Sequence, residues 1–470
     1  MIDTIITDVI VVTMDDDSTI FQTGGVAIND GKILSVGSTA EIKATYSATT
    51  EIAGEGGILL PGFINCHVHV PDILARGTRS DRPLHEWLLS IKQPFVHAMD
   101  EQDHELAAAL YCMESLCAGV TTVVENAGGT GVGYPLDIIE TKLNVYEQAG
   151  IRNIYAHGFV DRHQETAFAD YLDRIRSKYP DTTHPESATV DTAEALKTIE
   201  TLIERYHTAP EGRQSIWPAP YLAWGVTEEG LIGARRIAET HDTMTTTHTA
   251  ETALQERHLE SSVERLYNAG YLGERTVLAH GVHLSDRDIR LLAETKTTVA
   301  HNVAANCALG SGVAPVPQLL GHGVTVGLGT DNASINDQID MLQDVRLASF
   351  IHKATNEDPA AVTAEAMLRA ATIDAARAIG READLGSIEA GKKADLLVLD
   401  TDHPSCVPFQ DVISHIVYQT TGRDVGRVFC DGKQVVANGT VESLASTYQT
   451  LHEDAQHRAD DIFDRANIST

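Results

Sequence analysis

The chain has 470 residues with 67 acidic and 35 basic side chains, which gives a formal net charge of −32. This charge repels nucleic acid and anionic membrane surfaces, so we expect neither as a partner. No segment reaches the length of about 18 apolar residues that a membrane span needs. The start, MIDTIITDVIVVTMDDD, lacks the basic segment of a secretory signal, and the six cysteines form no CxxC pair. We therefore predict a cytoplasmic protein with reduced cysteines.

The acidic excess is distributed along the whole chain. Counter-ions at high salt screen the self-repulsion of such a surface, which favours a halophilic protein over an ordinary acidic cytosolic one. We expect removal of salt to destabilise the fold.

Short β segments with turns occupy both ends of the chain. Residues 1–58 contain three of them, and Asn29-Asp30-Gly31 supplies the turn chemistry of a hairpin. The same texture returns over 385–445, where Asp431-Gly432 is a second hairpin signal. We predict that the two ends share one small β domain and that residues 446–470 form a C-terminal helix.

Apolar strand-like runs alternate with amphipathic helical segments over residues 59–384, a pattern typical of parallel strands with crossover helices. There are eight such runs, which is the number that closes a (β/α)8 TIM-type barrel in the α/β class. The runs span residues 57–69, 119–127, 152–161, 215–225, 243–251, 276–284, 297–303 and 324–333.

Candidate metal ligands stand at the carboxyl ends of three of these runs. His67 and His69 are separated by one residue in PGFINCHVH, so in a strand both imidazoles point the same way. His248 ends the fifth run and Asp331 the eighth. Barrel enzymes place their chemistry at these ends. Three imidazoles and one carboxylate, with a position left for water, predict one catalytic divalent metal, with zinc favoured over iron.

Two further ionisable residues are placed to move protons. Glu251 follows His248 by three residues, and its carboxyl can protonate a ring nitrogen and then a leaving amine. His280 ends the sixth run, where it can orient the attacking water and stabilise developing charge. Asp331 can accept the proton of that water. We predict Glu251, His280 and Asp331 as catalytic residues.

A set of motifs occurs in one order along nearly the whole chain. They are PGFINCHVH, ARG at 75–77, EWL at 86–88, HTAE at 248–251, AHGVHL at 279–284, VAHN at 299–302, GLGTDNAS at 327–334 and LGSIEAGKKADLLVLD at 385–400. This order resembles the amidohydrolase superfamily, in its mononuclear branch of cytosine, guanine and methylthioadenosine/S-adenosylhomocysteine deaminases and s-triazine hydrolases. The resemblance implies a composite β-sandwich from the two chain ends, the metal and proton-handling roles given above, and a homo-oligomer.

The fourth run, SIWPAPYLAWG, contains no lysine. Binuclear members of the superfamily bridge two metals with a modified lysine on this strand, so the resemblance implies a single metal. Hydrolysis of cyclic amides is correspondingly less favoured than deamination.

The substrate is predicted from departures from the family pattern. Nucleoside deaminases that look like this chain place a glutamate nine residues after the EWL tryptophan, where this chain has Val96, and a histidine before Ala/Ser-Pro-Tyr, where it has Pro218. Loss of both polar contacts favours a free heterocyclic base or a triazine-like ring. The candidate substrate-binding residues are Trp87, Tyr221 and Trp224 for stacking, and Glu125, Asp161 and Arg162 for polar contacts.

We therefore predict hydrolytic deamination of an aromatic N-heterocycle, with release of ammonia. The alternatives are removal of chloride or an alkylamine from a triazine-type ring, deamination of an adenosine derivative, and a non-catalytic metal-binding protein.

Overall fold

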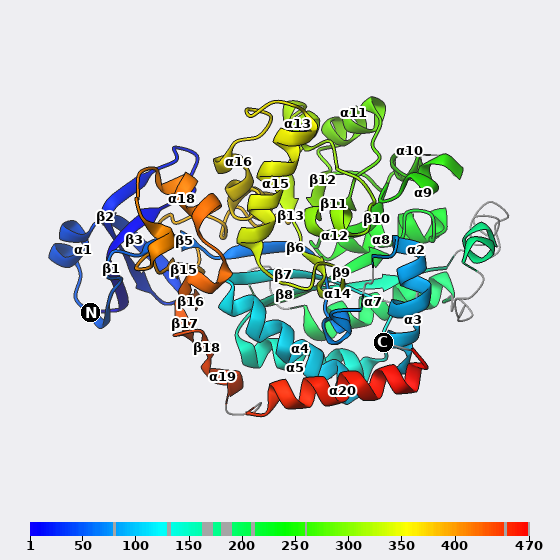
Figure 1. The fold of residues 1–470 in the computed structure, drawn as a ribbon, viewed down its shortest axis with the longest axis horizontal. Helices are drawn as coiled ribbons and strands as arrows, with labels where there is room; N and C mark the ends of the chain where they lie inside the picture. The colour runs from blue at the N-terminus through cyan, green and yellow to red at the C-terminus, as the bar shows by residue number, and fades with distance from the viewer. Residues whose placement is uncertain are drawn as a thin grey trace.

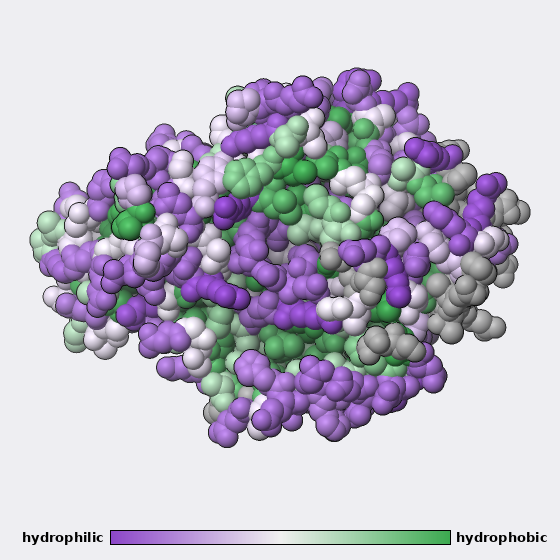
Figure 2. Space-filling model, in the orientation of Figure 1, coloured by the Kyte–Doolittle hydropathy of each residue, from purple (hydrophilic) through white to green (hydrophobic). Residues whose placement is uncertain are grey.

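The computed structural model describes residues 1–78, 81–128, 133–161, 173–179, 190–207, 212–258, 261–445 and 449–468. A β-sheet built from both ends of the chain lies beside a larger α/β unit, and a long C-terminal helix runs beneath that unit (Figure 1). Within the described ranges, no helix combines the length and the apolarity that crossing a membrane needs. Hydrophilic side chains cover much of the face in Figure 2, in keeping with the charge of −32.

The first unit is a nine-stranded sheet that joins the two chain ends. Its order is β18-β17-β16-β15-β5-β1-β2-β3, and β4 also pairs with β1. The expected sandwich strands are thus hydrogen-bonded as one continuous sheet, with two bulges in β1. The strands are β1 (Ile2–Val12), β2 (Ile20–Asn29), β3 (Lys32–Ser38), β4 (Ala48–Ala53), β5 (Ile58–Pro61), β15 (Leu396–Leu399), β16 (Val425–Cys430), β17 (Lys433–Ala437) and β18 (Thr440–Val441).

Both predicted hairpin turns of this sheet are confirmed. Asp30 and Gly31 have φ of 52° and 74°, and they connect β2 to β3. Asp431 and Gly432 have φ of 46° and 70°, and they connect β16 to β17. Two consecutive residues at positive φ are what a type I′ turn requires, and Asp-Gly supplies them at low cost.

The second unit contains the eight predicted runs as nine described strands, because the eighth run is divided into β13 and β14. They form a five-stranded sheet, β14-β6-β7-β8-β9, and a four-stranded sheet, β10-β11-β12-β13. The strands are β6 (Phe63–His69), β7 (Val120–Ala127), β8 (Arg152–Phe159), β9 (Gln214–Pro220), β10 (Thr245–Thr249), β11 (Thr276–His280), β12 (Thr298–His301), β13 (Val326–Leu328) and the short β14 (Asp331–Asn332).

The two sheets are connected at both edges. On one side a parallel bridge joins Leu222, just after β9, to His248 in β10. On the other side β13 pairs with β12, and β14, which follows three residues later, pairs with β6 through Asp331 and Val68. This is the strand order of a (β/α)8 barrel, and the predicted fold class is confirmed.

Helices surround the strands and have the expected end signals. Asp100 and Asp103 form a capping box at the start of α4, and Gly150 ends α5 with φ of 81°. The first helices along the chain are α1 (Thr39–Thr45), η1 (Pro71–Ala75), α2 (Leu84–Trp87), the π-helix η2 (Leu88–Lys92), α3 (Gln93–Ala98), α4 (Glu101–Cys117), α5 (Leu136–Ala149), α7 (Thr192–Tyr206), α8 (Glu228–Thr240), α9 (Ala253–His258) and α10 (Ser262–Asn268). The later ones are α11 (Asp286–Thr295), α12 (Val303–Ala308), α13 (Val316–Gly321), α14 (Ala333–Asn336), α15 (Met341–Thr355), α16 (Ala364–Arg369), α17 (Ile373–Ala378), η3 (Pro404–Cys406), α18 (Val412–Gln419), η4 (Gly422–Asp424), α19 (Glu442–Ala445) and α20 (Leu451–Ala466).

The C-terminal helix α20 packs against the barrel rather than extending from it (Figure 1). Arg458 and Arg465 bridge to Asp103, each at 2.6 Å, and the Phe463 ring lies 4.8 Å from that of Phe95. Asp103 is fully buried, so α20 supplies the positive charges that this carboxylate needs.

Candidate metal centre and active site

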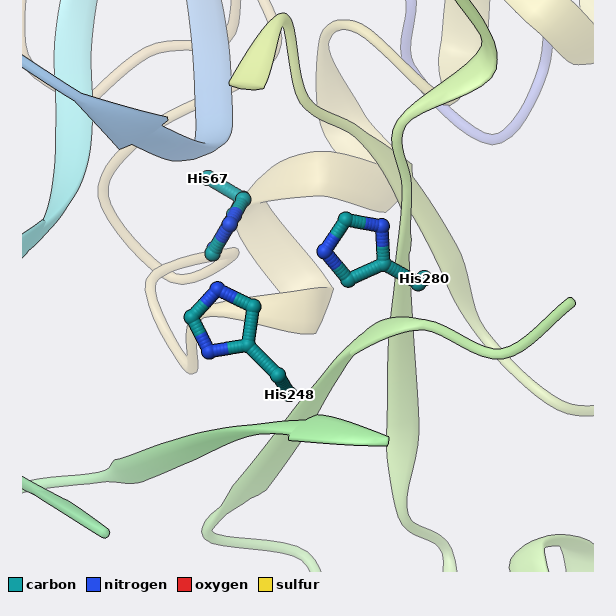
Figure 3. Close-up of side chains that lie close together, drawn as sticks. All are labelled: His67, His248 and His280. Carbon is teal, nitrogen blue, oxygen red and sulfur yellow. The ribbon is translucent and has the colours of Figure 1, made fainter. Parts of the chain in front are cut away.

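Six ionisable side chains predicted from strand ends converge at the carboxyl end of the barrel. His67 and His69 come from β6, His248 from β10 and His280 from β11. Figure 3 shows the rings of His67, His248 and His280 facing one another from three separate segments. The ligand atoms of these three lie within 4.8 Å of one another, as do those of His67, His69 and Asp331. The structure therefore brings all four predicted ligands and His280 into one buried cluster.

Two of the imidazoles face each other with their lone pairs. Nδ1 of His69 donates to the Asn126 carbonyl at 2.7 Å, and Nδ1 of His248 donates to the Tyr221 carbonyl at 2.6 Å. Both Nε2 atoms are then unprotonated, and they stand 3.1 Å apart. Burial lowers the pKa of both rings well below its usual value, so neither ring readily gains a second proton. Binding of a cation by both nitrogens would relieve this repulsion.

His67 adds a second indication that the cluster fits a cation. Its side chain is fully buried, and neither ring nitrogen has a hydrogen-bond partner. Nε2 stands 3.6 Å from Asp331 Oδ1, and Nε2 of His69 lies at the same distance from that oxygen. A buried nitrogen without a partner is costly unless it ligates a metal. The donor set of imidazoles and one carboxylate fits a divalent ion such as zinc.

Backbone strain is concentrated at this centre. Asp331, His280 and Ala250 have φ of 57°, 77° and 50°, in the left-handed region that residues other than glycine rarely adopt. Asp331 begins β14, His280 ends β11, and Ala250 directly follows β10, which carries His248. Such strain persists where the surrounding structure imposes it, which occurs preferentially at functional sites.

Glu251 and His280 form a pair beside the cluster. Glu251 Oε2 lies 3.8 Å from His280 Nε2, and both side chains are almost completely buried. Burial raises the pKa of Glu251 above its usual value, and a positive charge on His280 would oppose this shift. On the other side of the His280 ring, Nδ1 contacts Asn306 Oδ1 at 3.0 Å. Asn306 therefore fixes the tautomer in which His280 presents an unprotonated Nε2 to the centre.

A small pocket of about 40 Å³ opens onto the cluster. Trp87 and Tyr221, predicted to stack on a substrate ring, both line it. The full lining is His69, Leu84, Trp87, Leu88, Lys92, Tyr221, Leu222, His248, Glu251, His280, Asp331 and Asn332.

Two polar residues of this pocket, Lys92 and Asn332, are absent from the sequence prediction. The Lys92 ammonium donates to Asn332 Oδ1 at 3.2 Å and lies 3.1 Å from Asp72 Oδ2. Burial by itself lowers the pKa of Lys92, but Asp72, Tyr221 and Asp331 together outweigh it, so the pKa lies above its usual value. Lys92 therefore stays charged inside the pocket wall.

Other predicted substrate contacts lie elsewhere. Glu125 points toward α5, where it is paired with Lys142 and accepts a hydrogen bond from the Tyr146 hydroxyl at 2.7 Å. Asp161 accepts from the backbone N–H of Thr227 at 2.6 Å and from the Thr192 hydroxyl at 2.7 Å. Neither carboxylate belongs to the described lining of the pocket, and both hold hydrogen bonds to neighbouring segments, so their contact with substrate stays a prediction.

The last two predicted contacts have different outcomes. Trp224 packs against Ile175, and the Arg265 guanidinium lies 5.2 Å from its ring, so its indole is a packing residue outside the described pocket lining. Arg162 lies outside the described residues.

Comparison with known proteins agrees with this geometry. Residues 58–435 match the model of the amidohydrolase family. The chain is 33% identical over 430 residues to a 5'-deoxyadenosine deaminase of Methanothermobacter thermautotrophicus, covering 90% of this chain and 92% of that protein. It is 34% identical over 328 residues to an s-triazine hydrolase of Gordonia rubripertincta, covering 69% of this chain and 68% of the relative.

A solved structure shows the same fold. It is an adenosine deaminase from Xanthomonas campestris with bound zinc, which is 25% identical with a TM-score of 0.82 and matches 97% of this chain and 99% of its own. The predicted resemblance is confirmed, and the chain belongs to the amidohydrolase family.

Proposed function

We propose that the protein is a metal-dependent hydrolase that removes ammonia from an aminated aromatic N-heterocycle. The observation that carries this proposal is the juxtaposition of a buried cluster of possible metal ligands with the buried pair of Glu251 and His280. Nε2 of His69 and of His248 face each other at 3.1 Å, and Glu251 stands 3.8 Å from His280 beside them. Deaminases among the relatives support the same chemistry.

The residues of this chain divide the reaction between them. His67, His69, His248 and Asp331 would hold a divalent metal, which supplies Lewis-acid activation of the attacking water when bound. His280, held by Asn306, orients that water through its unprotonated Nε2. Glu251 takes one proton of the water and donates it to the ring nitrogen next to the amine-bearing carbon, and it then passes the second proton, which it receives from Asp331, to the departing amine. Asp331 accepts the second proton of the water.

Asn306 is a positioning residue for His280, and this role is testable. Asn306→Leu removes the acceptor for Nδ1–H, so the His280 tautomer and ring orientation are no longer fixed, and we expect kcat to fall about 10- to 100-fold. Asn306→Asp keeps an acceptor and is expected to recover most of the activity. Steady-state kinetics of the two variants test this, and equal activity in the leucine variant would exclude the positioning role.

The pocket supports a free base or a triazine-like ring over a nucleoside. Val96 is buried in the apolar core with Phe95, and Pro218 lies within β9, where its carbonyl accepts from the Thr245 hydroxyl. Neither side chain can bind a ribose hydroxyl. An unpaired ribose hydroxyl in a buried site is costly.

The relatives indicate two alternative hydrolytic functions. The 5'-deoxyadenosine deaminase acts on an adenosine derivative, and the s-triazine hydrolase acts on a triazine, so a nucleoside or a ring with another leaving group are the competing substrates. A non-catalytic metal-binding protein is not favoured, because such a protein has no use for a buried Glu251 next to His280.

A panel assay decides among these functions. Zinc- and iron-loaded protein is incubated in molar salt with aminopurines, aminopyrimidines, pterins, aminotriazines, chlorotriazines and adenosine derivatives, and ammonia, alkylamine and chloride are measured. Ammonia from a free base or aminotriazine supports the proposal. Ammonia from nucleosides alone would overturn the substrate assignment, and release of chloride or alkylamine alone would overturn the leaving group.

Three finer properties belong to the same proposal. We infer zinc rather than iron as the native metal, a cytoplasmic location, and a homo-oligomer. Metal analysis of protein purified without added metal, cell fractionation and light scattering of the purified protein test them in turn.

We also infer that the protein is adapted to high salt. The charge of −32 makes self-repulsion the largest salt-sensitive contribution to stability. We expect the midpoint of thermal unfolding to rise by at least about 5 °C between 0.1 M and 2 M KCl. Differential scanning calorimetry measures this, and an unchanged midpoint would contradict salt adaptation.

A further inference from the structure

Lys92 occupies an unusual position in the pocket. It ends η2, a π-helical turn in which the Gln93 N–H bonds to the Leu88 carbonyl five residues back. Residues five apart lie on nearly the same face of a π-helix, so Lys92 is brought over the Trp87 ring, 5.6 Å from its centroid. In a regular α-helix, residues five apart are separated by well over a quarter turn. The π-turn therefore directs this ammonium to the wall that carries Trp87.

The counter-ion of Lys92 lies behind it. Asp72 belongs to η1, is buried, and is not part of the described pocket lining, whereas Lys92, Tyr221 and Asn332 are. Among the described lining residues, Lys92 carries the one ammonium. The ion pair thus neutralises the lysine from the rear, while on the pocket side the ammonium donates to Asn332 Oδ1 and shares the described lining with Tyr221.

Asn332 links this donor group to the predicted metal centre. Its Oδ1 accepts from Lys92 at 3.2 Å, and its Nδ2 donates to Asp331 Oδ1 at 3.0 Å. The amide orientation is therefore determined by both neighbours. A ring bound between the cluster and Trp87 has the hydrolytic groups on one side and Lys92 on another.

We propose that Lys92, together with the Tyr221 hydroxyl, binds a carbonyl or enolate oxygen of the substrate ring, so that the enzyme selects amino-heterocycles that carry a ring oxygen. The inference rests on the proposed function. It goes beyond that function because it names the substituent the ring must have apart from the departing amine. A ring oxygen gives the buried ammonium and the Tyr221 hydroxyl a further acceptor, whereas a C–H group at the same position gives none, so the ring that carries the oxygen is favoured.

The experiment compares ring pairs that share the amine and differ in one oxygen. Guanine is compared with 2-aminopurine, 8-oxoadenine with adenine, and isocytosine with 2-aminopyrimidine. For zinc-loaded parent protein, kcat/KM of ammonia release and affinity by titration calorimetry are both measured. We expect the oxygen-bearing ring to be preferred by about 10- to 100-fold in at least one pair. Equal affinity and equal kcat/KM within every pair would overturn the proposal without any variant.

Variants assign the preference to Lys92. Lys92→Met is expected to remove it by lowering the values for the oxygen-bearing ring alone, and Lys92→Arg is expected to keep part of it. Lys142→Met is the matched control, because Lys142 forms an equally buried ion pair with Glu125 outside the described pocket lining. A preference that survives in Lys92→Met, or that Lys142→Met removes equally, would contradict the assignment.

The two proposals fail in different ways. If no ring releases ammonia, the proposed deamination is wrong, and the affinity ratio within each pair still decides whether Lys92 binds a ring oxygen. If ammonia is released without preference for the oxygen-bearing ring, the deamination stands and the role of Lys92 is wrong.

Discussion

Replacing Glu251 with glutamine is expected to lower kcat for ammonia release by about 10²- to 10⁴-fold. The amide keeps the shape of the side chain and cannot deliver a proton to the ring nitrogen or to the leaving amine. Glu251 is only 5% exposed and stands 3.8 Å from His280 Nε2, so bulk water is poorly placed to replace it. Steady-state assays on the best ring of the panel measure the loss.

A nearby glutamate provides the control for this change. Glu256 lies in α9, where it accepts a hydrogen bond from the Ser262 hydroxyl at 2.8 Å, outside the described pocket lining. Its pKa is also raised by burial. Glu256→Gln is expected to keep the parent kcat. A Glu251→Gln protein that is folded, metal-loaded and as active as the parent would exclude proton transfer by this residue.

Replacing His248 with alanine is expected to weaken zinc binding by at least about 100-fold and to abolish detectable turnover. In the parent, Nε2 of His248 and of His69 face each other, and a cation relieves their repulsion. Removing one ring removes both a ligand and the repulsion. The metal-free variant should therefore be at least as stable as the metal-free parent, while zinc should no longer raise its unfolding temperature.

His283 provides the matched control for the ligand variant. It stands three residues beyond His280, and its Nε2 contacts the Ser311 carbonyl at 2.8 Å. His283→Ala is expected to bind zinc as the parent does in a competition titration with a chromophoric chelator. Parent-like zinc affinity in His248→Ala would contradict its role as a ligand.

The barrel and the central cluster were predictable from the sequence because parallel strands place their carboxyl ends at one face. Alternation along β6 directs His67 and His69 into one cavity, and the ends of β10, β11 and β14 add His248, His280 and Asp331. These predictions need only strand periodicity and strand order. Neither depends on fine packing.

The direction of the Glu125 side chain could not be predicted from the sequence, for a physical reason. Every residue of β7 is buried, because the barrel interior covers one face and helices cover the other. A strand buried on both faces has no polar periodicity to distinguish inside from outside. The direction of Glu125 is set by Lys142 and Tyr146 on α5, which lie 17 and 21 residues away along the chain.

Lys92 was not predictable for a different reason. Its place in the pocket depends on the π-turn over Leu88–Lys92, which adds a residue to the helical repeat without a local sequence signal. In a regular α-helix over this segment, Lys92 and Trp87 would lie on different faces. Tertiary contacts with Asp72 and Asn332 hold it in place, and both come from distant parts of the chain.

A zinc titration of metal-free protein tests the central claim most directly, with ammonia release from the best ring as the readout. The arrangement of His67, His69, His248 and Asp331 around one position predicts a rate that rises linearly with added zinc and levels off at one equivalent per chain. Ammonia release that is independent of zinc, or that levels off only at two equivalents, would contradict a single-metal hydrolytic centre at these residues.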